Sequence, residues 1–279
     1  MGELKVVAMD MDGTLLTASQ DILPYTRKVL MQLQQQGVSL LLASGRDIDS
    51  LQKIGQKLNL SDYPQSGYIC LNGLEIYDSL GNQLHQEEKL QFKDAAILAD
   101  MAKTYHIDMI LFFKNSLYIM DFGQTGITEH HFMTSTKYKV QDIKEIPLSE
   151  FEDLRKVAFV QKASILNEIL PTLQQTAHQQ FDLCKVEPDW VEINPYGSHK
   201  GAALQKYASI KNISIDHIIA FGNGENDIEM LKIAGKGIAM GNSFENVKYV
   251  ADDICEDNEH EGIGLYLQEY LKKQISELN

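Results

Sequence analysis

Short apolar runs alternate with amphipathic segments in the first part of the chain. The runs are apolar at nearly every position, which is typical of strands buried on both faces of a sheet. In the intervening segments apolar residues recur at helical spacing, and one such segment opens at Pro24 and ends before Gly37. This alternation indicates a parallel sheet covered by helices. It predicts strands over 5–10, 38–44 and 68–72 and helices over 24–36 and 47–59.

From about residue 74 the pattern changes to hairpins. A turn at 80–82 separates two alternating segments, and a second strand–turn–strand pattern spans 108–121. We therefore expect an antiparallel α+β block inserted into a parallel α/β domain. In this block we expect helices over 92–106 and 165–180 and strands over 157–161 and 181–187. After a segment at 190–195 the parallel pattern returns, with helices over 199–208, 225–234 and 243–251 and strands over 217–222 and 237–241.

Charge and cysteine content narrow the class of protein. The 39 acidic and 25 basic side chains give a net charge of −14, which argues against binding of nucleic acid through a basic face. Cys70, Cys184 and Cys255 lie far apart without a paired motif, as expected in a reducing compartment. No apolar run approaches the roughly 18 residues that span a bilayer, and no signal peptide is recognisable. We expect a cytoplasmic protein that binds neither nucleic acid nor membranes.

Asp10 and Asp12 provide the sharpest chemical signal. They lie where the first predicted strand ends, and the carboxyl ends of parallel strands form the ligand crevice of open α/β sheets. One carboxylate could attack phosphorus as a nucleophile, the second could donate and accept protons, and Mg²⁺ would offset the like charges. Neither possible register of segment 8–21 fits a calcium-binding loop. An ordinary turn rich in Asp and Gly is the alternative interpretation.

Three further segments follow predicted strands. The Ser44 hydroxyl and nearby amides, including that of Gly45, could hold a phosphate oxygen at a helix N-terminus, although a serine there is also a common helix cap. Lys200 begins a predicted helix, where a solvated lysine is the simpler interpretation. In so acidic a chain, however, it could stabilise a transferring phosphoryl group. The segment 221–227 offers oxygen ligands for a hard cation, or a hairpin turn.

Together these four segments resemble the motifs of the haloacid-dehalogenase superfamily of phosphotransferases, specifically its Cof-like phosphatases with a large α/β cap. They occur in the expected order as DMDGTLL, ASGR, SHKG and GNGEND. LNGLEIYD (71–78) is similar to the family's motif before the cap, and DNEHEGIG (257–264) to its loop near the C-terminus. The resemblance covers essentially the whole chain. It implies an α/β fold with a Rossmann-like parallel-sheet core (1–83 and 192–279) and an inserted α+β cap domain (84–191).

The resemblance also implies roles for the motif residues. Asp10 would be the nucleophile and Asp12 the general acid/base. The other candidates would bind the phosphoryl group, hold Mg²⁺ or support these residues. The phosphoryl oxygens would be bound by Ser44, Gly45 and Lys200. Mg²⁺ would be held by the Asp10 carboxylate, the Asp12 main-chain carbonyl, Asn223 and Asp227. The supporting residues would be Asn72, Gly73 and Asn226.

Asn223 departs from the family pattern. The family usually has Gly-Asp where this chain has Gly222-Asn223. An amide oxygen can still coordinate Mg²⁺, but one negative charge is missing, and Asn226 and Asp227 would have to compensate.

The resemblance predicts a Mg²⁺-dependent phosphatase that hydrolyses small phosphorylated metabolites through an aspartyl-phosphate. Sugar phosphates are the first substrate class expected, and phosphorylated cofactors the second. Two alternatives remain open. A phosphomutase of the same superfamily would return the phosphoryl group to its substrate. A phosphometabolite-binding protein with weakened catalysis is suggested by Asn223.

Overall fold

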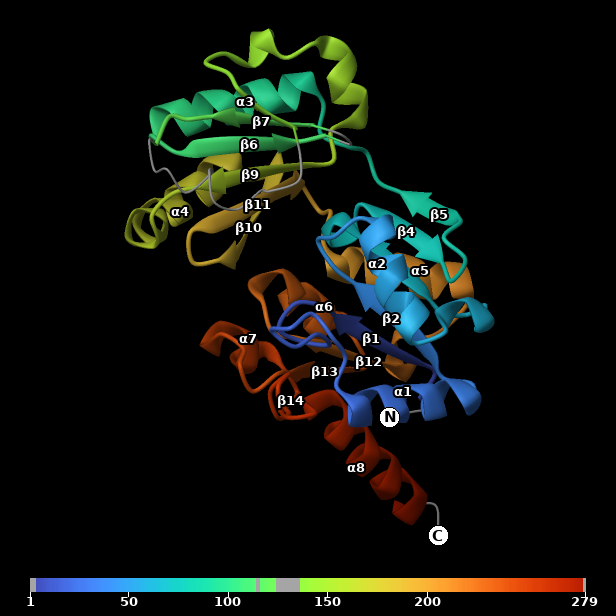
Figure 1. The fold of residues 1–279 in the computed structure, drawn as a ribbon. Helices are drawn as coiled ribbons and strands as arrows, with labels where there is room; N and C mark the ends of the chain where they lie inside the picture. The colour runs from blue at the N-terminus through green and yellow to red at the C-terminus, as the bar shows by residue number, and fades with distance from the viewer. Residues whose placement is uncertain (1–3, 114–115, 124–135, 278–279) are drawn as a thin grey trace. The chain divides into compact units, whose positions relative to one another are not determined.

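The computed structural model describes residues 4–113, 116–123 and 136–277. The chain forms two compact units, residues 1–87 with 199–279 and residues 88–198 (Figure 1). We call them the eight-stranded unit and the six-stranded unit after their sheets. Among the described residues, no helix combines the length and apolar character that crossing a membrane requires.

The eight-stranded sheet is parallel over its first six strands and ends in an antiparallel hairpin. Side chains of successive residues point to opposite faces, so Val7 and Met9 enter one core cluster while Val6 and Ala8 enter another, all of them fully buried. The strands lie in the order β14 (Asp253–Ile254), β13 (Lys236–Ala239), β12 (Ile218–Gly222), β1 (Val6–Asp10), β2 (Ser39–Ala43), β3 (Gly67–Cys70), β4 (Glu75–Asp78) and β5 (Gln83–Gln86).

Helices cover both faces of this sheet. Each of them contributes apolar side chains to one of the two core clusters, which places the sheet between two helical layers. One face is covered by α1 (Pro24–Gln35), α2 (Ile48–Lys57) and α8 (Gly262–Glu277), and the other by α5 (Lys200–Lys211), α6 (Ile228–Ile233) and α7 (Glu245–Val250).

The six-stranded sheet is antiparallel except for its last pair, and helices cover one of its faces. The helices are α3 (Phe92–Thr104) and α4 (Ala163–Ala177), which pack their apolar side chains against the sheet. The strands follow the order β10 (Phe181–Glu187), β11 (Trp190–Pro195), β9 (Lys156–Val160), β6 (Asp108–Phe112), β7 (Ser116–Met120) and β8 (Thr136–Lys139).

Two segments lie in a different unit from the one that the sequence pattern suggested. The predicted insert began at 84, but β5 pairs with β4 and extends the eight-stranded sheet. The predicted core resumed at 192, but β11 lies between β10 and β9 in the six-stranded sheet. Strand pairing decides both assignments, because a strand belongs to the sheet in which its backbone groups find partners.

Helix α8 was not anticipated from the sequence. Its segment opens with Gly262 and Gly264, and glycine disfavours a helix interior by about 1 kcal/mol. The helix forms where it can pack against α1, so tertiary contact stabilises it more than local preference.

The loop before α8 also completes the start of α1. Leu23 at the N-cap offers no side-chain acceptor, and Pro24 has no N–H. The Glu261 carboxylate instead accepts hydrogen bonds from the amides of Tyr25 (3.0 Å) and Thr26 (2.7 Å). A carboxylate at this end of a helix also interacts favourably with the helix dipole.

Replacement of Glu261 by alanine should therefore destabilise the protein by about 1 kcal/mol, the usual effect of removing a helix N-cap. The measurement is the thermal unfolding midpoint of the full chain. Glu245→Ala is the control, because Glu245 is exposed and its ion pair with Lys248 (3.1 Å) lies on the surface. Equal midpoints for the two variants would show that Glu261 does not cap α1.

Candidate active site

Asp10 and Asp12 lie in contrasting environments. Asp10 is the last residue of β1, at the centre of the eight-stranded sheet, and its side chain is buried. The chain turns sharply after it, with Gly13 at φ +76° and the Leu15 amide donating back to the Asp10 carbonyl (3.2 Å). The Asp12 side chain is 52% exposed. One carboxylate is therefore dehydrated while the other is accessible to solvent.

Lys200 joins Asp10 to a second buried carboxylate. Lys200 is the first residue of α5, and its side chain is completely buried. Its Nζ lies 2.5 Å from Asp10 Oδ1 and 2.7 Å from Asp227 Oδ1. A buried ammonium needs such partners, because an unpaired charge is strongly disfavoured away from water. The interpretation of Lys200 as a solvated surface lysine is therefore wrong.

The ionisation of this cluster follows from burial and charge. Burial, and then the Asp227 carboxylate, raise the pKa of Asp10, while the Lys200 ammonium opposes that rise. Burial alone would lower the pKa of Lys200, but the carboxylates of Asp10 and Asp227 raise it above its ordinary value. The lysine is therefore charged, and it favours the ionised form of Asp10 that a nucleophile requires.

Both oxygens of Asp227 have partners. Oδ1 accepts from Lys200, and Oδ2 accepts from the main-chain amides of Asn223 and Gly224, both at 2.9 Å. These bonds fix the turn after β12 against the lysine. Oδ2 thus accepts two bonds and Oδ1 accepts one from Lys200, so Asp227 positions both the lysine and the turn after β12.

The Asn223 side chain lies where three oxygens converge. In the orientation that satisfies both amide atoms, its nitrogen donates to the Asp12 carbonyl (2.9 Å), Thr14 Oγ1 (2.6 Å) and Asp10 Oδ2 (3.2 Å). The amide thus contacts a carboxylate oxygen and a carbonyl oxygen, and its own Oδ1 would be the third oxygen of the set. Hard oxygen donors of this kind suit Mg²⁺.

The oxygen donors gathered beside Asp10 are one carboxylate, one main-chain carbonyl and one side-chain amide. Within residues 4–113, 116–123 and 136–277, no group of three or more His, Cys, Asp or Glu side chains could hold a metal ion. A cation beside Asp10 would depend on the Asp12 carbonyl and on Asn223 as well.

Ser44 and Gly45 follow β2 at the same end of the sheet. Ser44 is buried, its carbonyl accepts from the Asn72 amide (3.0 Å), and its hydroxyl accepts from the Arg46 amide (3.2 Å). The cap of α2 is Asp47, whose side chain accepts from the Ser50 amide (3.0 Å), so Ser44 is not a helix cap. Among the described residues no acceptor binds its hydroxyl hydrogen, which can therefore donate to a phosphate oxygen.

The segment 71–73 connects several of these loops. Leu71, Asn72 and Gly73 all have positive φ, an unfavourable conformation for the first two. Asn72 Oδ1 accepts from Asn226 Nδ2 (3.1 Å), which links this segment to the turn after β12. The predicted supporting residues Asn72 and Asn226 are thus in contact with each other.

Arg46 and Gln20 are two site residues that sequence reasoning did not select. Both bond to the Asp12 carboxylate. Arg46 lies in the ASGR motif and is one of three arginines, so its scarcity in an acidic chain was a usable signal. Nothing in the local sequence of Gln20 distinguishes it from other surface glutamines.

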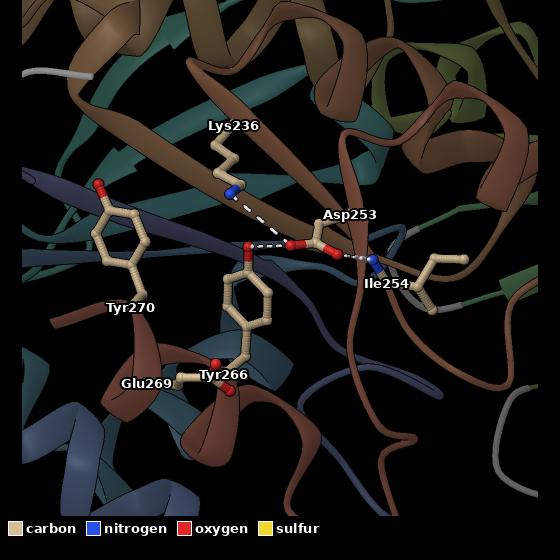
Figure 2. A pocket seen from close by; sticks show the side chains of 6 residues that line it. All are labelled: Lys236, Asp253, Ile254, Tyr266, Glu269 and Tyr270. Carbon is tan, nitrogen blue, oxygen red and sulfur yellow. Dashed lines mark hydrogen bonds and ion pairs between the residues drawn. The ribbon is translucent and has the colours of Figure 1, made fainter. Parts of the chain in front are cut away.

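The eight-stranded unit also contains a pocket of about 270 Å³ that includes none of the predicted site residues. Figure 2 shows Lys236 beside Asp253 (3.8 Å) and the hydroxyl of Tyr266 donating to the same carboxylate (3.0 Å). The lysine also lies over the rings of Tyr266 and Tyr270. Asp253 and Ile254 form the edge strand β14, so the pocket lies at this edge of the sheet, whereas Asp10 lies near the sheet's centre.

Gly73 should be intolerant of a side chain because of its contact with the residue before Lys200. An added Cβ would lie 2.6 Å from the His199 carbonyl oxygen, and φ is +111°. Gly73→Ala should therefore displace Lys200 and lower turnover about tenfold or more. Gly37→Ala is the matched control, since it has similar strain (φ +89°) but open space around the new methyl group. The measurements are turnover and unfolding midpoint, and equal turnover in both variants would contradict the expected clash.

Comparison with known proteins supports the resemblance to haloacid-dehalogenase phosphatases. The sequence model of the haloacid dehalogenase-like hydrolases matches residues 7–267. The HMP-PP phosphatase of Cronobacter sakazakii is 32% identical over 85% of this chain and 84% of its own length. The 5-amino-6-(5-phospho-D-ribitylamino)uracil phosphatase YcsE of Bacillus subtilis is 30% identical over 96% of each chain. The pyridoxal phosphate phosphatase YbhA of Escherichia coli is 29% identical over 96% of this chain and 98% of its own.

Solved structures confirm the predicted fold class. SMU.1108c from Streptococcus mutans is 24% identical and covers 97% of this chain and 100% of its own, with a TM-score of 0.80. The phosphatase BT1666 from Bacteroides thetaiotaomicron is also 24% identical. The match covers 96% of this chain and 95% of BT1666, with a TM-score of 0.77. The expected enzyme class, a phosphoric monoester hydrolase, agrees with the names of the three relatives. The chain belongs to the haloacid dehalogenase-like hydrolase family.

Proposed function

We propose that this protein is a Mg²⁺-dependent phosphatase that hydrolyses small phosphorylated metabolites through an aspartyl-phosphate on Asp10. The observation that carries the proposal is the environment of that carboxylate. Oδ1 is paired with the buried Lys200, and Oδ2 faces the Asp12 carbonyl and the Asn223 side chain. Asp10 thus lies between a fixed ammonium and a set of oxygen donors suited to Mg²⁺.

The residues of the eight-stranded unit can perform both chemical steps. An Asp10 carboxylate oxygen attacks phosphorus, the bond from phosphorus to the ester oxygen breaks, and Asp12 protonates the departing alcohol. Water then attacks the phosphorus of the aspartyl-phosphate and passes a proton to Asp12, which releases inorganic phosphate and restores Asp10. The exposure of Asp12 suits a group that exchanges protons with alcohol and water.

The remaining residues stabilise the transferring phosphoryl group. The Ser44 hydroxyl and the Gly45 amide donate to its oxygens, and the Lys200 ammonium offsets their charge. Bound Mg²⁺, held by Asp10, the Asp12 carbonyl and Asn223, would neutralise charge on the same group. Asp227 keeps Lys200 in place through its contact at 2.7 Å.

The relatives guide the choice of substrates. Three proteins of similar identity to this chain carry the names of three different phosphorylated compounds. A screen for phosphate release should therefore include HMP-PP, the ribitylaminouracil phosphate and pyridoxal phosphate together with sugar phosphates. Free phosphate as product supports a phosphatase, whereas an isomeric phosphate would indicate a phosphomutase. The cytoplasmic location stays a prediction.

Asp10→Asn should reduce Mg²⁺-dependent phosphate release below detection, because an amide cannot form the covalent intermediate. Trapping of the phosphorylated protein by acid quench should likewise succeed with the wild type and fail with the variant. Asp62→Asn, at an exposed position of the same unit, should retain full activity. Substantial phosphate release by a folded Asp10→Asn protein would eliminate the proposed mechanism.

Asn223→Asp should tighten Mg²⁺ binding, because a carboxylate would replace the amide beside Asp10 Oδ2 and the Asp12 carbonyl. We expect the half-saturating Mg²⁺ concentration to fall about tenfold. Without Mg²⁺ the two facing carboxylates repel each other, so the unfolding midpoint should also rise more on Mg²⁺ addition than in the wild type.

The matched control is Asn242→Asp, which adds the same charge at an exposed residue bonded to the neighbouring Gly13 carbonyl (2.9 Å). Identical Mg²⁺ midpoints for the wild type and Asn223→Asp would mean that Asn223 is not a ligand.

A further inference from the structure

The Asp12 carboxylate is held by two side chains from separate loops. Arg46 Nε donates to Oδ2 (2.9 Å), and Arg46 Nη2 donates to Oδ1. Gln20 Nε2 also donates to Oδ1 (3.2 Å), while Gln20 Oε1 accepts from Arg46 Nη2. The three side chains form a closed ring of hydrogen bonds, and we call Gln20 and Arg46 the Asp12 clamp.

The turn that carries Gln20 is anchored on both sides. Lys57 of α2 pairs with Asp21 (2.7 Å), and Glu259 accepts from the Ala18 amide (2.6 Å). Gln20 itself has φ +62°, a conformation that a non-glycine residue adopts only at an energetic cost. The fold thus maintains an unfavourable backbone conformation at the residue whose side chain completes the ring.

Arg46 is equally well placed by its backbone. Its carbonyl accepts from the Leu71 amide (3.0 Å), and its amide donates to Ser44 Oγ (3.2 Å). Exposed ion pairs usually contribute little, but a planar two-point contact between arginine and carboxylate is the exception, because it fixes orientation as well as charge. Here it restrains a carboxylate that is otherwise half-exposed.

The two oxygens of Asp12 are not equivalent. Oδ1 accepts from both Gln20 and Arg46, whereas the described residues give Oδ2 a hydrogen bond from Arg46 Nε alone. A carboxylate oxygen has two lone pairs, so Oδ2 keeps one direction open for proton transfer. Oδ1 is therefore the anchored oxygen and Oδ2 the oxygen that can exchange a proton.

We propose that Gln20 and Arg46 are positioning residues that hold Asp12 Oδ2 where it protonates the leaving alcohol. This inference rests on the proposed function, in which Asp12 is the general acid and base. A misplaced proton donor matters most for substrates whose leaving oxygen needs protonation, since a good leaving group departs unaided. Loss of the clamp should therefore alter the dependence of the rate on the leaving group.

The test compares kcat/KM for p-nitrophenyl phosphate with kcat/KM for the alkyl phosphate that the wild type hydrolyses best. Gln20→Gly removes the side chain but suits the left-handed backbone, so the turn is retained. Gln20→Gly should lose about tenfold on the alkyl phosphate and little on the aryl phosphate. Arg46→Lys keeps the charge but loses the two-point contact, and it should shift the ratio in the same direction. Gln52→Ala, which loses a bond to the Leu80 carbonyl (3.2 Å), is the matched control.

Asp12→Asn separates failure of the clamp from failure of the proposed function. It should discriminate strongly between the two substrates, and adding Gln20→Gly to it should cause no further shift in their ratio. Absence of discrimination by Asp12→Asn would refute the acid role of Asp12 itself. If Asp12→Asn discriminates between the substrates but Gln20→Gly leaves the ratio of their kcat/KM values unchanged, the positioning role of the clamp is wrong and the acid role of Asp12 stands.

Discussion

The site is organised around one buried ammonium between two buried carboxylates. Lys200 lies at the start of α5, Asp10 ends β1 and Asp227 lies beyond β12. None of the three could remain charged in the interior alone, since dehydration of an isolated charge has a large cost. Lys200 stabilises both carboxylates and is stabilised by both of them, so the end of β1, the start of α5 and the turn after β12 depend on one another.

Hydrogen bonds between neighbouring loops make the position of one loop depend on the next. Asp227 uses its second oxygen to hold the main chain at Asn223, so the turn that positions the lysine also positions the candidate metal ligand. Asn72 contacts Asn226 and the Ser44 carbonyl, which connects three loops at one edge of the sheet. The loop before α8 supports the turn at Gln20 through Glu259 and the start of α1 through Glu261. Residues far from the chemistry thereby fix the geometry of the carboxylates.

The acidic character of the chain gives these contacts their importance. A protein with a net charge of −14 repels phosphate unless positive charge is placed near the site. The fold supplies it in two forms: Lys200 is buried against Asp10, while Arg46 is partly exposed and bound to Asp12. Lys200 favours the ionised form of the proposed nucleophile, whereas Arg46 orients the carboxylate of the proposed proton donor.

The sequence by itself determined the alternation of buried strands and helices, and with it the placement of Asp10, Ser44 and Asn223 after parallel strands. Periodicity and motif order depend on residues close in sequence, so they are visible without the structure. The tertiary structure alone decided the pairing of β11, the stability of α8 and the contacts of Gln20 with Asp12. These depend on partners distant in sequence, such as α1 for α8, and on backbone conformations like that of Gln20, which no local pattern specifies.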